Sequence, residues 1–560
     1  SIGVDILRRG GNAMDAAAAV GFALTVLKPH QNGIGGEVPM LVYSARDQGV
    51  RAISGHGVAP VAATIARLKS LRLDIIPGDG LLPALVPPAP ASWLLLLERF
   101  GTLRLADVLE PTIELAELGF PMYDSLHESI EAQRRRFSAE WPSSAAVFLP
   151  SGAAPPVASV WRQPVLARMF RRLLDAESAH RDRERGLRAA LDRFYRGDIA
   201  RELVTFCRNT AVRDASGREH RGLLSEADLA GFSARIEGAV CSNYRGLTVF
   251  KCSSWTQGPA MIQALNILEN FDLQSFGHNS APYLHHLIEA MKLAYADREL
   301  WYGDPLFSEV PLARLLSKDY ARERARLVDP NRASLELRPD GYPPLGISSS
   351  KDVDRAFAAA AHATGHGDTT KLEVIDSKGN MVSATPSGGW LMSSPVIPEL
   401  GFPLGTRGQM FSLNPGHPNC LAPGKRPRTT LTPSLALKGE TPYLSFGSPG
   451  GDFQDQWALQ FLLNVVEFGM SLQAAVEAPT VADLSAPSSF YPRLPEPGVV
   501  CVEDRVPREV CRALGGLGHK VRLVPAWTQG NTLAAAIDTE SGVLSAAASP
   551  RLDPAYAGGY

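Results

Sequence analysis

The chain has 560 residues, enough to bury a large core, and its 45% hydrophobic and 20% charged content is that of an ordinary globular protein. A net charge of −2 leaves no basic excess for binding nucleic acid, and no acidic block predicts a disordered tail. The longest apolar run, residues 16–27, is shorter than the roughly 20 residues of a membrane span.

Cysteine spacing gives no sign of metal or redox chemistry, because the chain has no CxxC pair and no metal-ligand spacing. We therefore expect scattered, mostly buried thiols, no metal site and no cofactor. The cysteines are Cys207, Cys241, Cys252, Cys420, Cys501 and Cys511. The chain opens at Ser1 without a charged-then-apolar leader, which indicates a trimmed protein or a fragment and leaves the compartment open.

In chain order, the first predicted element is a helix that starts at residues 10–15 and continues into alanine-rich sequence. A glycine loop at 33–36 and a strand at Met40–Ser44 follow. Residues 160–235 read as helices whose mixed charges form a solvated face. A strand at Leu247–Cys252 then precedes a long helix at Ala281–Trp301.

A polar, proline-rich connector with little periodicity covers roughly residues 329–368, and the pattern changes at Thr369. Residues 370–376 alternate polar and apolar side chains, residues 377–380 carry turn chemistry, and 381–385 form a second strand, which predicts a hairpin. Later strands are expected at 435–437, 443–446, 500–503 and 533–538, and helices at 456–469 and 472–477. The pattern favours a mostly antiparallel, two-sheet core flanked by helices.

The common catalytic signatures are missing: the sequence has no GxSxG elbow, HExxH, phosphate loop or dinucleotide-binding loop. His285 and His286 lie in an apolar helix, and we expect no i, i+4 ligand partner and no metal role for them.

One arrangement does carry chemistry: the connector ends in Asp368 and Thr369, and a strand follows at once. A threonine hydroxyl is a weak nucleophile that needs a base, and the α-amine of an N-terminal threonine, with a pKa near 7.7–8.0, is such a base. Cleavage of the Asp368–Thr369 bond by the threonine's own hydroxyl would create that amine. Taken alone, the motif is a weak signal, and a helix cap or a turn leading into a sheet is the better explanation of it.

The segment resembles the start of the small subunit of γ-glutamyltransferases, which begins with two threonines, a short strand and an Asp-x-x-Gly-Asn turn. The matching residues here are Thr369-Thr370 and Asp376 to Asn380. Further short motifs that resemble those of the family occur in the family's order along the chain, at residues 9–15, 194–197, 244–246, 265–271, 294–298, 303–305, 424–427, 447–451 and 557–560.

The resemblance implies an α+β fold of the N-terminal-nucleophile hydrolase kind, a four-layer αββα sandwich. It also implies one large unit built from two processed fragments: residues 1–368, ending in the connector 329–368, and the catalytic residues 369–560. Self-cleavage would leave a heterodimer of these fragments that acts on a small-molecule amide, with no nucleic acid and no membrane span in this chain. The family points to a periplasmic or secreted location, while a cytoplasmic one stays open.

Four catalytic positions follow from the resemblance. Thr369 would be the nucleophile of both self-cleavage and turnover, and Ser387 falls where the family has a hydroxyl that bonds the nucleophile. Gly450 and Gly451 would offer backbone N–H groups to the tetrahedral oxyanion.

The substrate positions combine matches with departures. Thr429 and Thr430 replace the serine pair that binds the α-carboxylate of a γ-glutamyl group. His56 replaces an arginine that clamps this carboxylate, Met410 replaces the aspartate that holds the α-amino group, and Gly389 replaces an asparagine that contacts the substrate.

Arg407 stands where the family carries glutamine, and its guanidinium could grip a carboxylate with two N–H groups. Together with Met410, this favours an acyl group with a distal acid and no α-amine, as in glutaryl-type acylases. Three hypotheses therefore remain: a γ-glutamyl hydrolase or transferase, such an acylase, and an unprocessed, inactive binding scaffold. Within the enzyme hypotheses, hydrolysis is favoured over transfer because no acceptor site is recognisable.

Overall fold

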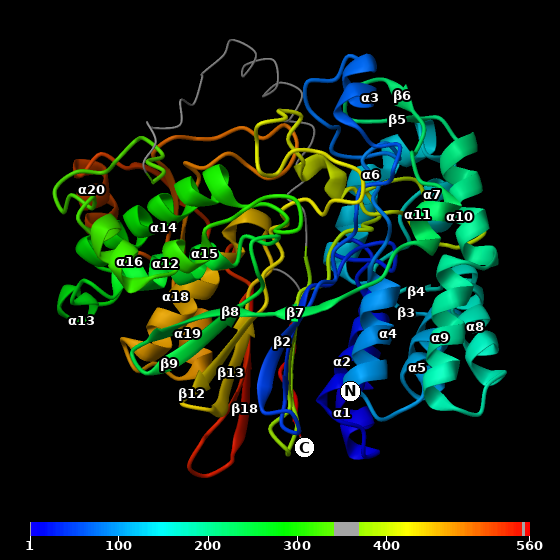
Figure 1. Cartoon of the computed structure of the whole chain (residues 1–560), viewed down its shortest axis with the longest axis horizontal. Helices are drawn as coiled ribbons and strands as arrows, with labels where there is room; N and C mark the ends of the chain where they lie inside the picture. The colour runs from blue at the N-terminus through cyan, green and yellow to red at the C-terminus, as the bar shows by residue number, and fades with distance from the viewer. Residues whose placement is uncertain (1, 341–368, 552–554, 560) are drawn as a thin grey trace.

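The computed structural model describes residues 2–340, 369–551 and 555–559 (Figure 1). Two sheets lie at its centre, with helices on either side of the pair (Figure 1). Asp368 and the connector from residue 341 onward fall outside the described residues, as do residues 552–554.

The first sheet has the strand order β10-β11-β1-β2-β7, with every neighbouring pair antiparallel. Its strands are β10 (Leu372–Ile375), β11 (Met381–Ala384), β1 (Met40–Ser44), β2 (Gly49–Ile53) and β7 (Ile236–Gly238). The hairpin β10–β11 follows Thr369, yet it pairs with β1 from the beginning of the chain. This sheet is therefore built from both sides of the predicted cleavage point.

The second sheet is also antiparallel and has the order β18-β17-β13-β12-β9-β8. Its strands are β18 (Leu544–Ala548), β17 (Leu533–Ile537), β13 (Thr441–Gly447), β12 (Ser434–Lys438), β9 (Leu247–Lys251) and β8 (Val240–Tyr244). The pairing of β12 with β9 again joins residues after 369 to residues before 341.

The two sheets pack face to face, and the alternation along β1 shows how. Leu41 and Tyr43 point toward the second sheet and pack with Leu435 and Leu437. Met40 and Val42 point the other way, toward the helices. Successive side chains of a strand face opposite sides. A strand between two apolar layers is therefore buried along its whole length, as β1 is.

Helix α2 (Ala13–Leu27) covers the outer face of the first sheet. Its alanines are almost wholly buried, and a side chain at Gly21 would overlap Trp93 of α4 (Ala89–Phe100), so small residues let helix and neighbours approach closely. The N-terminus of α2 is fixed by a capping box between Asn12 and Asp15.

The remaining elements on this side surround α2 and α4. They are α1 (Ile2–Arg8), α3 (Ile65–Ser70), α5 (Leu105–Leu118), α6 (Asp124–Ala139), α7 (Pro142–Phe148), α8 (Pro164–Ser178), α9 (Arg183–Tyr195), α10 (Asp198–Asn209) and α11 (Glu226–Ala230), with the short pairs β3 (Phe120–Pro121) and β4 (Val160–Trp161), and β5 (Val212–Arg213) and β6 (Glu219–His220).

On the opposite side, α12 and α18 pack on the second sheet, α14 packs on α12, and all three helices share one apolar cluster with the sheet. The elements of this side are α12 (Pro259–Leu268), α13 (Leu273–Phe276), α14 (Ala281–Trp301), α15 (Leu312–Leu315), α16 (Lys318–Ala325), α18 (Gln454–Val466), α19 (Leu472–Glu477), α20 (Arg508–Gly516), β14 (Val481–Asp483), β15 (Val499–Glu503) and β16 (Lys520–Val524), with the 3-10 turn η2 (Gly451–Phe453). A second 3-10 turn, η1 (Arg407–Met410), bonds to the loop at residues 78–83 of the other half.

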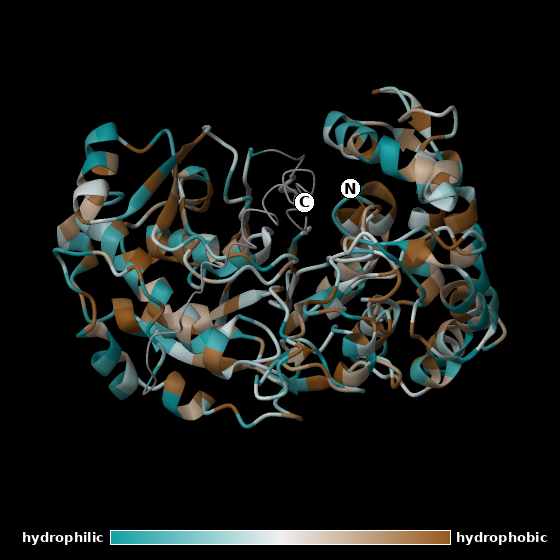
Figure 2. Ribbon diagram, turned by 90° about the horizontal axis from the view of Figure 1, so that it is seen from above, coloured by the Kyte–Doolittle hydropathy of each residue, from teal (hydrophilic) through white to brown (hydrophobic). Residues whose placement is uncertain are grey.

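The order helix, sheet, sheet, helix confirms the predicted αββα architecture. Hydrophilic residues lie along the outer edges of both helical layers (Figure 2). No helix within residues 2–340, 369–551 and 555–559 combines the length and apolar content that a membrane crossing requires.

Candidate active site

Thr369 lies at the head of β10, where its backbone forms an isolated antiparallel bridge with Ser387. The amide of Thr370 donates to the carbonyl of Pro386 at 3.0 Å and fixes the register. Thr369 Oγ1 and Ser387 Oγ are 3.0 Å apart, and both residues are buried. The structure therefore brings together the two hydroxyls that the resemblance had paired.

Glu37 extends this row by one more strand, just before β1. Its N–H donates to the carbonyl of Ser387 at 2.7 Å, and the N–H of Ser387 donates to the carbonyl of Glu37 at 2.9 Å. Residues opposite one another in adjacent strands project from the same face. Thr369, Ser387 and Glu37 thus form one row across the end of the first sheet.

Arg407, in η1, reaches into this row from a separate loop. Its Nη2 donates to Ser387 Oγ at 2.5 Å and its Nε donates to Glu37 Oε2 at 2.7 Å. Its Nη1 has no hydrogen-bond partner among the described residues. Burial lowers the pKa of the guanidinium, and the Glu37 carboxylate opposes that shift.

Two aromatic rings flank the Arg407 guanidinium. Its central carbon lies 5.0 Å from the ring of Trp390 and 5.3 Å from the ring of Phe490. A side chain at Gly451 would lie 3.0 Å from Phe490, so Phe490 is close to both Arg407 and the diglycine.

His56 lies beside the Glu37 carboxylate, next to the oxygen that does not accept from Arg407 Nε. Its Nε2 donates to the carbonyl of Pro427 at 2.8 Å, and its Nδ1 is 3.5 Å from Glu37 Oε1. The ring stacks on Trp255 and is only 1% exposed. The structure thus connects His56 to the Glu37–Arg407 pair.

Gly450 directly precedes η2 and Gly451 is the first residue of η2, in the turn that leads from β13 into α18. Their φ angles are +122° and +57°, and a side chain at Gly450 would lie 2.2 Å from the ring of Trp457. Only glycine fits there without strain. Backbone N–H groups near a helix N-terminus attract negative charge, as an oxyanion site requires.

Thr429 and Thr430 are both buried but differ in their bonding. The hydroxyl of Thr429 accepts from the N–H of Leu431 at 3.3 Å. Thr430 Oγ1 has no hydrogen-bond partner within the described part of the chain. Of the two hydroxyls, that of Thr430 is the one left for a ligand.

Met410 and Gly389 are the two remaining positions that depart from the family pattern, and both lie in closely packed surroundings. Met410 is fully buried, and its carbonyl accepts from Asn419 at 2.7 Å and from Arg493 at 3.0 Å. Gly389 has φ +60°, and a side chain there would lie 2.7 Å from the amide nitrogen of Gly36. An asparagine at residue 389 would therefore require this loop to shift.

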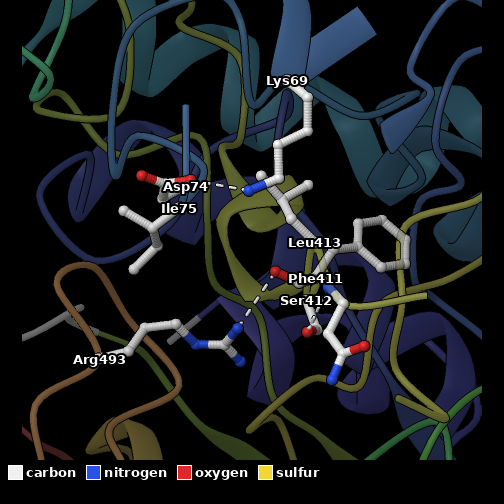
Figure 3. A pocket seen from close by; sticks show the side chains of 8 residues that line it. Lys69, Asp74, Ile75, Phe411, Ser412, Leu413 and Arg493 are labelled. Atoms are coloured by element: carbon white, nitrogen blue, oxygen red, sulfur yellow. Dashed lines mark hydrogen bonds and ion pairs between the residues drawn. The ribbon is translucent and has the colours of Figure 1, made fainter. Parts of the chain in front are cut away.

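A cavity of ≈ 350 Å³ opens beside the loop that follows Met410 (Figure 3). An ion pair between Lys69 and Asp74 and the side chain of Arg493 line it, and Arg493 Nη1 donates to the carbonyl of Phe411 at 3.1 Å. The sequence analysis did not identify this cavity, which residues far apart in the chain assemble.

A buried cluster of polar side chains lies on α14, in the helical layer outside the second sheet. His285, Glu289 and His519 are close enough to share a metal ion, and Glu289 occupies the i+4 position from His285, so the expectation of no such partner was wrong. Glu289 already forms ion pairs with Lys292 and Arg338. His285 accepts from or donates to His519 at 2.9 Å, so this group is a buried polar network with its acidic charge balanced.

Sequence analysis missed three residues of the site: Glu37, Trp390 and Phe490. Glu37 directly follows the glycine loop 33–36, in which Gly33 and Gly36 pack against the carbonyls of residues 387–389. That loop was the available signal, because glycine often marks a close backbone approach.

Two face-to-face sheets between helical layers, with paired hydroxyls at the end of one sheet, define the class of N-terminal-nucleophile hydrolases. The sequence model of the family described as gamma-glutamyltranspeptidase matches residues 1–559, and the chain belongs to this family.

Three relatives illustrate the range of the family. The glutathione hydrolase proenzyme of Bacillus subtilis (strain 168) is 31% identical over 557 residues, covering 98% of this chain and 87% of its own. A solved structure titled LmbA2991HD is 44% identical with a TM-score of 0.90, covering 98% of this chain and 94% of its own. The cephalosporin acylase of Bacillus halodurans is 30% identical with a TM-score of 0.82, covering 100% and 94%. The protein is therefore an enzyme of the γ-glutamyltranspeptidase and acylase kind.

Proposed function

We propose that the protein is a self-processing amidohydrolase or acyltransferase in which Thr369 is the nucleophile. The observation that carries this proposal is the 3.0 Å contact between Thr369 Oγ1 and Ser387 Oγ at the head of β10. The family membership supports it, since the Bacillus subtilis relative is by name a proenzyme.

In self-cleavage, Thr369 Oγ1 attacks the carbonyl carbon of Asp368, and the acyl group moves from nitrogen to oxygen. Water then hydrolyses the ester, which leaves a carboxylate on Asp368 and a free α-amine on Thr369. The products are fragments of residues 1–368 and 369–560.

In turnover, the new α-amine takes the proton of the Thr369 hydroxyl as Oγ1 attacks the substrate amide. The N–H groups of Gly450 and Gly451 hold the oxyanion. The amine then returns the proton to the leaving nitrogen, and water or an acceptor amine releases the acyl group from the ester.

For the acyl group, we propose that the Thr430 hydroxyl and Arg407 Nη1 bind polar atoms of the substrate, with Met410, Gly389 and His56 setting the shape of the site. The first candidate is a γ-glutamyl or related acyl group. Buried Met410, which cannot offset an ammonium charge, favours the second candidate, a glutaryl-type acyl group without an α-amine.

The test is denaturing gel electrophoresis of the purified chain and of Thr369→Ala, followed by a panel of acyl p-nitroanilides. We expect the wild type to split in two and Thr369→Ala to stay whole and inactive. A wild-type chain that stays whole and hydrolyses no anilide would instead support an unprocessed binding scaffold. Preference for γ-glutamyl over glutaryl anilides would decide between the two acyl candidates.

A further inference from the structure

Asp452 directly follows the two glycines proposed to hold the oxyanion, and its contacts come from several parts of the chain. Its carboxylate accepts from Arg298 Nη1 at 2.8 Å and from the N–H and hydroxyl of Ser489 at 2.8 and 2.6 Å. Its carbonyl accepts from the hydroxyl of Tyr295 and from Gln257 Nε2, the latter at 3.4 Å. The residue that follows the diglycine is therefore fixed through both its side chain and its backbone.

We propose that Asp452 is a positioning residue, which fixes the peptide groups of Gly450 and Gly451 so that their N–H groups face the oxyanion. This inference rests on the oxyanion role proposed for the two glycines. Asp452 acts through the turn rather than on the substrate.

The turn needs such a support because it contains two consecutive glycines. Glycine has no Cβ and takes positive and negative φ values about equally well, so a diglycine does not keep one conformation by itself. The φ angles of Gly450 and Gly451 are +122° and +57°. Contacts from outside the diglycine must therefore select this conformation.

Two planar peptide groups carry the constraint from Asp452 to an oxyanion donor. The carbonyl of Asp452 shares one peptide group with the N–H of Phe453, and the carbonyl of Gly450 shares another with the N–H of Gly451. Tyr295 holds the first group, whose N–H donates to the carbonyl of the second at 3.0 Å. In a trans peptide the N–H points opposite to the carbonyl, so Asp452 sets the direction of the Gly451 N–H.

Helix α14 supplies the rigid anchor for these contacts. Tyr295 and Arg298 are three positions apart and project from the same side of the helix, with the guanidinium 4.1 Å from the ring. Arg298 is fully buried and also donates to Gln257 Oε1 at 2.7 Å. The amide nitrogen of Gln257 in turn reaches the carbonyls of Gly451 and Asp452. A charged donor makes the bond to the Asp452 carboxylate stronger than a neutral donor would.

The surroundings of Asp452 allow it to be replaced without unfolding the chain. Arg298 has a second carboxylate partner, Glu299, at 2.9 Å, so it is not left as an unpaired buried charge. The Asp452 side chain is 14% exposed, and water can reach the N–H of Ser489 once the carboxylate is removed. Asp452→Ala removes every side-chain contact, whereas Asp452→Asn keeps the volume and removes only the charge.

Asp198→Ala is the matched control. Asp198 also follows a glycine and begins a helix, α10, and its carboxylate pairs with Arg193 at 2.6 Å and Arg172 at 2.8 Å. It lies in the other helical layer, away from the proposed site. Its replacement therefore reports the cost of losing such a carboxylate without a change in the oxyanion turn.

The variants are compared on an anilide that the wild type hydrolyses. Asp452→Ala should lower kcat at least about fivefold with KM within about twofold, because oxyanion contacts strengthen in the transition state. Asp452→Asn should lose less, and Asp198→Ala should keep the wild-type kcat. Thermal midpoints identify a variant that does not fold, and if Asp452→Ala is one, Asp452→Asn carries the comparison.

A boronic acid, with boron in place of the acyl carbonyl carbon, provides a second readout. The Thr369 oxygen bonds to boron and its proton passes to the α-amine, which leaves a tetrahedral anion that resembles the transition state. Its inhibition constant should rise by the same factor as kcat/KM falls, since both report transition-state binding. General loss of stability would not produce this match.

A smaller loss of kcat in Asp452→Ala, or a loss without the matching change in boronic acid binding, would overturn the inference. A raised KM with unchanged kcat would also overturn it and make Asp452 a substrate contact. Thr369→Ala is run beside the other variants. Activity in Thr369→Ala, or a wild-type chain that stays whole and hydrolyses no anilide, would reject the proposed function itself, whereas Thr369-dependent activity that is insensitive to Asp452 would reject this inference alone.

Discussion

Thr429 and Thr430 are neighbours in sequence, but their hydroxyls differ in hydrogen bonding. That of Thr429 accepts from a backbone N–H, while that of Thr430 is buried without a partner among the described residues. A buried, unpaired hydroxyl costs stability unless a ligand uses it.

Thr430→Val should therefore raise KM about tenfold, the loss of roughly one hydrogen bond of about 1.4 kcal/mol, and should raise the thermal midpoint of the ligand-free protein because an unpaired buried hydroxyl is removed. Thr429→Val is the matched comparison, and it should lower stability by about 1 kcal/mol through loss of the contact with Leu431. Anilide kinetics and thermal unfolding of both variants provide the measurement. The reverse pattern would move the substrate contact to Thr429.

Gly450→Ala should reduce kcat by roughly 10- to 100-fold, because the new methyl group meets Trp457 and displaces the N–H groups proposed for the oxyanion. Strain at φ +122° should cost about 1–3 kcal/mol of stability. Gly542→Ala is the control, with φ +74° and open space around the position. Equal activity in the two variants would argue against an oxyanion role for this turn.

Sequence reasoning reached Thr369 and Ser387 because a family pattern fixed their positions in the chain. It did not reach Glu37, whose role depends on the pairing of strands that are far apart in sequence. Phe490 was missed for the same reason, since its loop meets Arg407 only in the folded chain. Short motifs report neighbours in sequence, whereas this site is made by neighbours in space.

At the scale of single elements, the patterns worked where one periodicity dominates. The strand at Met40–Ser44 and the helices at Ala281–Trp301 and Leu472–Glu477 have the bounds that were predicted. The charged region 160–235 contains α8, α9 and α10, as expected.

Helix α4 was missed because residues 81–97 contain four prolines. Pro88 caps the helix and Pro90 lies in its first turn, where the missing N–H would have had no helical partner. Strands β2, β8 and β18 were also missed. They are short and alternate weakly, so their pairing with neighbouring strands decides their structure.

The contact between α14 and the segment before β16 makes stability depend on pH. Burial, aided by Lys292 and His285, lowers the pKa of His519 to about 3. In the unfolded chain the pKa of histidine is about 6.5. Below pH 6.5 the unfolded chain therefore binds a proton at His519 that the folded chain does not bind. This proton stabilises the unfolded state, so the free energy of unfolding is full above pH 6.5 and falls as the pH drops toward 3.

We expect the thermal midpoint of the wild type to fall more steeply between pH 7 and pH 5 than that of His519→Gln. Expressed as free energy of unfolding, the difference between the two slopes should approach about 1.4 kcal/mol per pH unit at the acidic end. His180→Gln, at an exposed position, serves as the control and should follow the wild type. Parallel curves for the wild type and His519→Gln would remove this contact from the acid response.

At the scale of the whole molecule, each central sheet combines strands from before residue 341 and after residue 368. A cut before Thr369 would therefore divide the chain without dividing the core. Asp376 adds a specific tie: its carboxylate closes the turn at 376–380 and accepts from the N–H of Ala13 at 2.9 Å, at the start of α2.

Asp376→Asn should lower the urea concentration at which the two fragments separate on gel filtration, because a charged hydrogen bond of about 1.5–3 kcal/mol is weakened. Asp538→Asn alters a similar turn carboxylate that bonds only within its own fragment and should leave the separation unchanged. Fragments that part without denaturant would contradict the shared-sheet arrangement.

The central claim is that Thr369 becomes a chain terminus and carries the acyl group. Mass analysis of protein quenched during turnover of an anilide tests both parts at once. We predict a fragment that begins at Thr369 and gains the mass of one acyl group on its first residue. A chain of 560 residues that remains unbroken while it consumes substrate, or an acyl group found on another residue, would contradict the account.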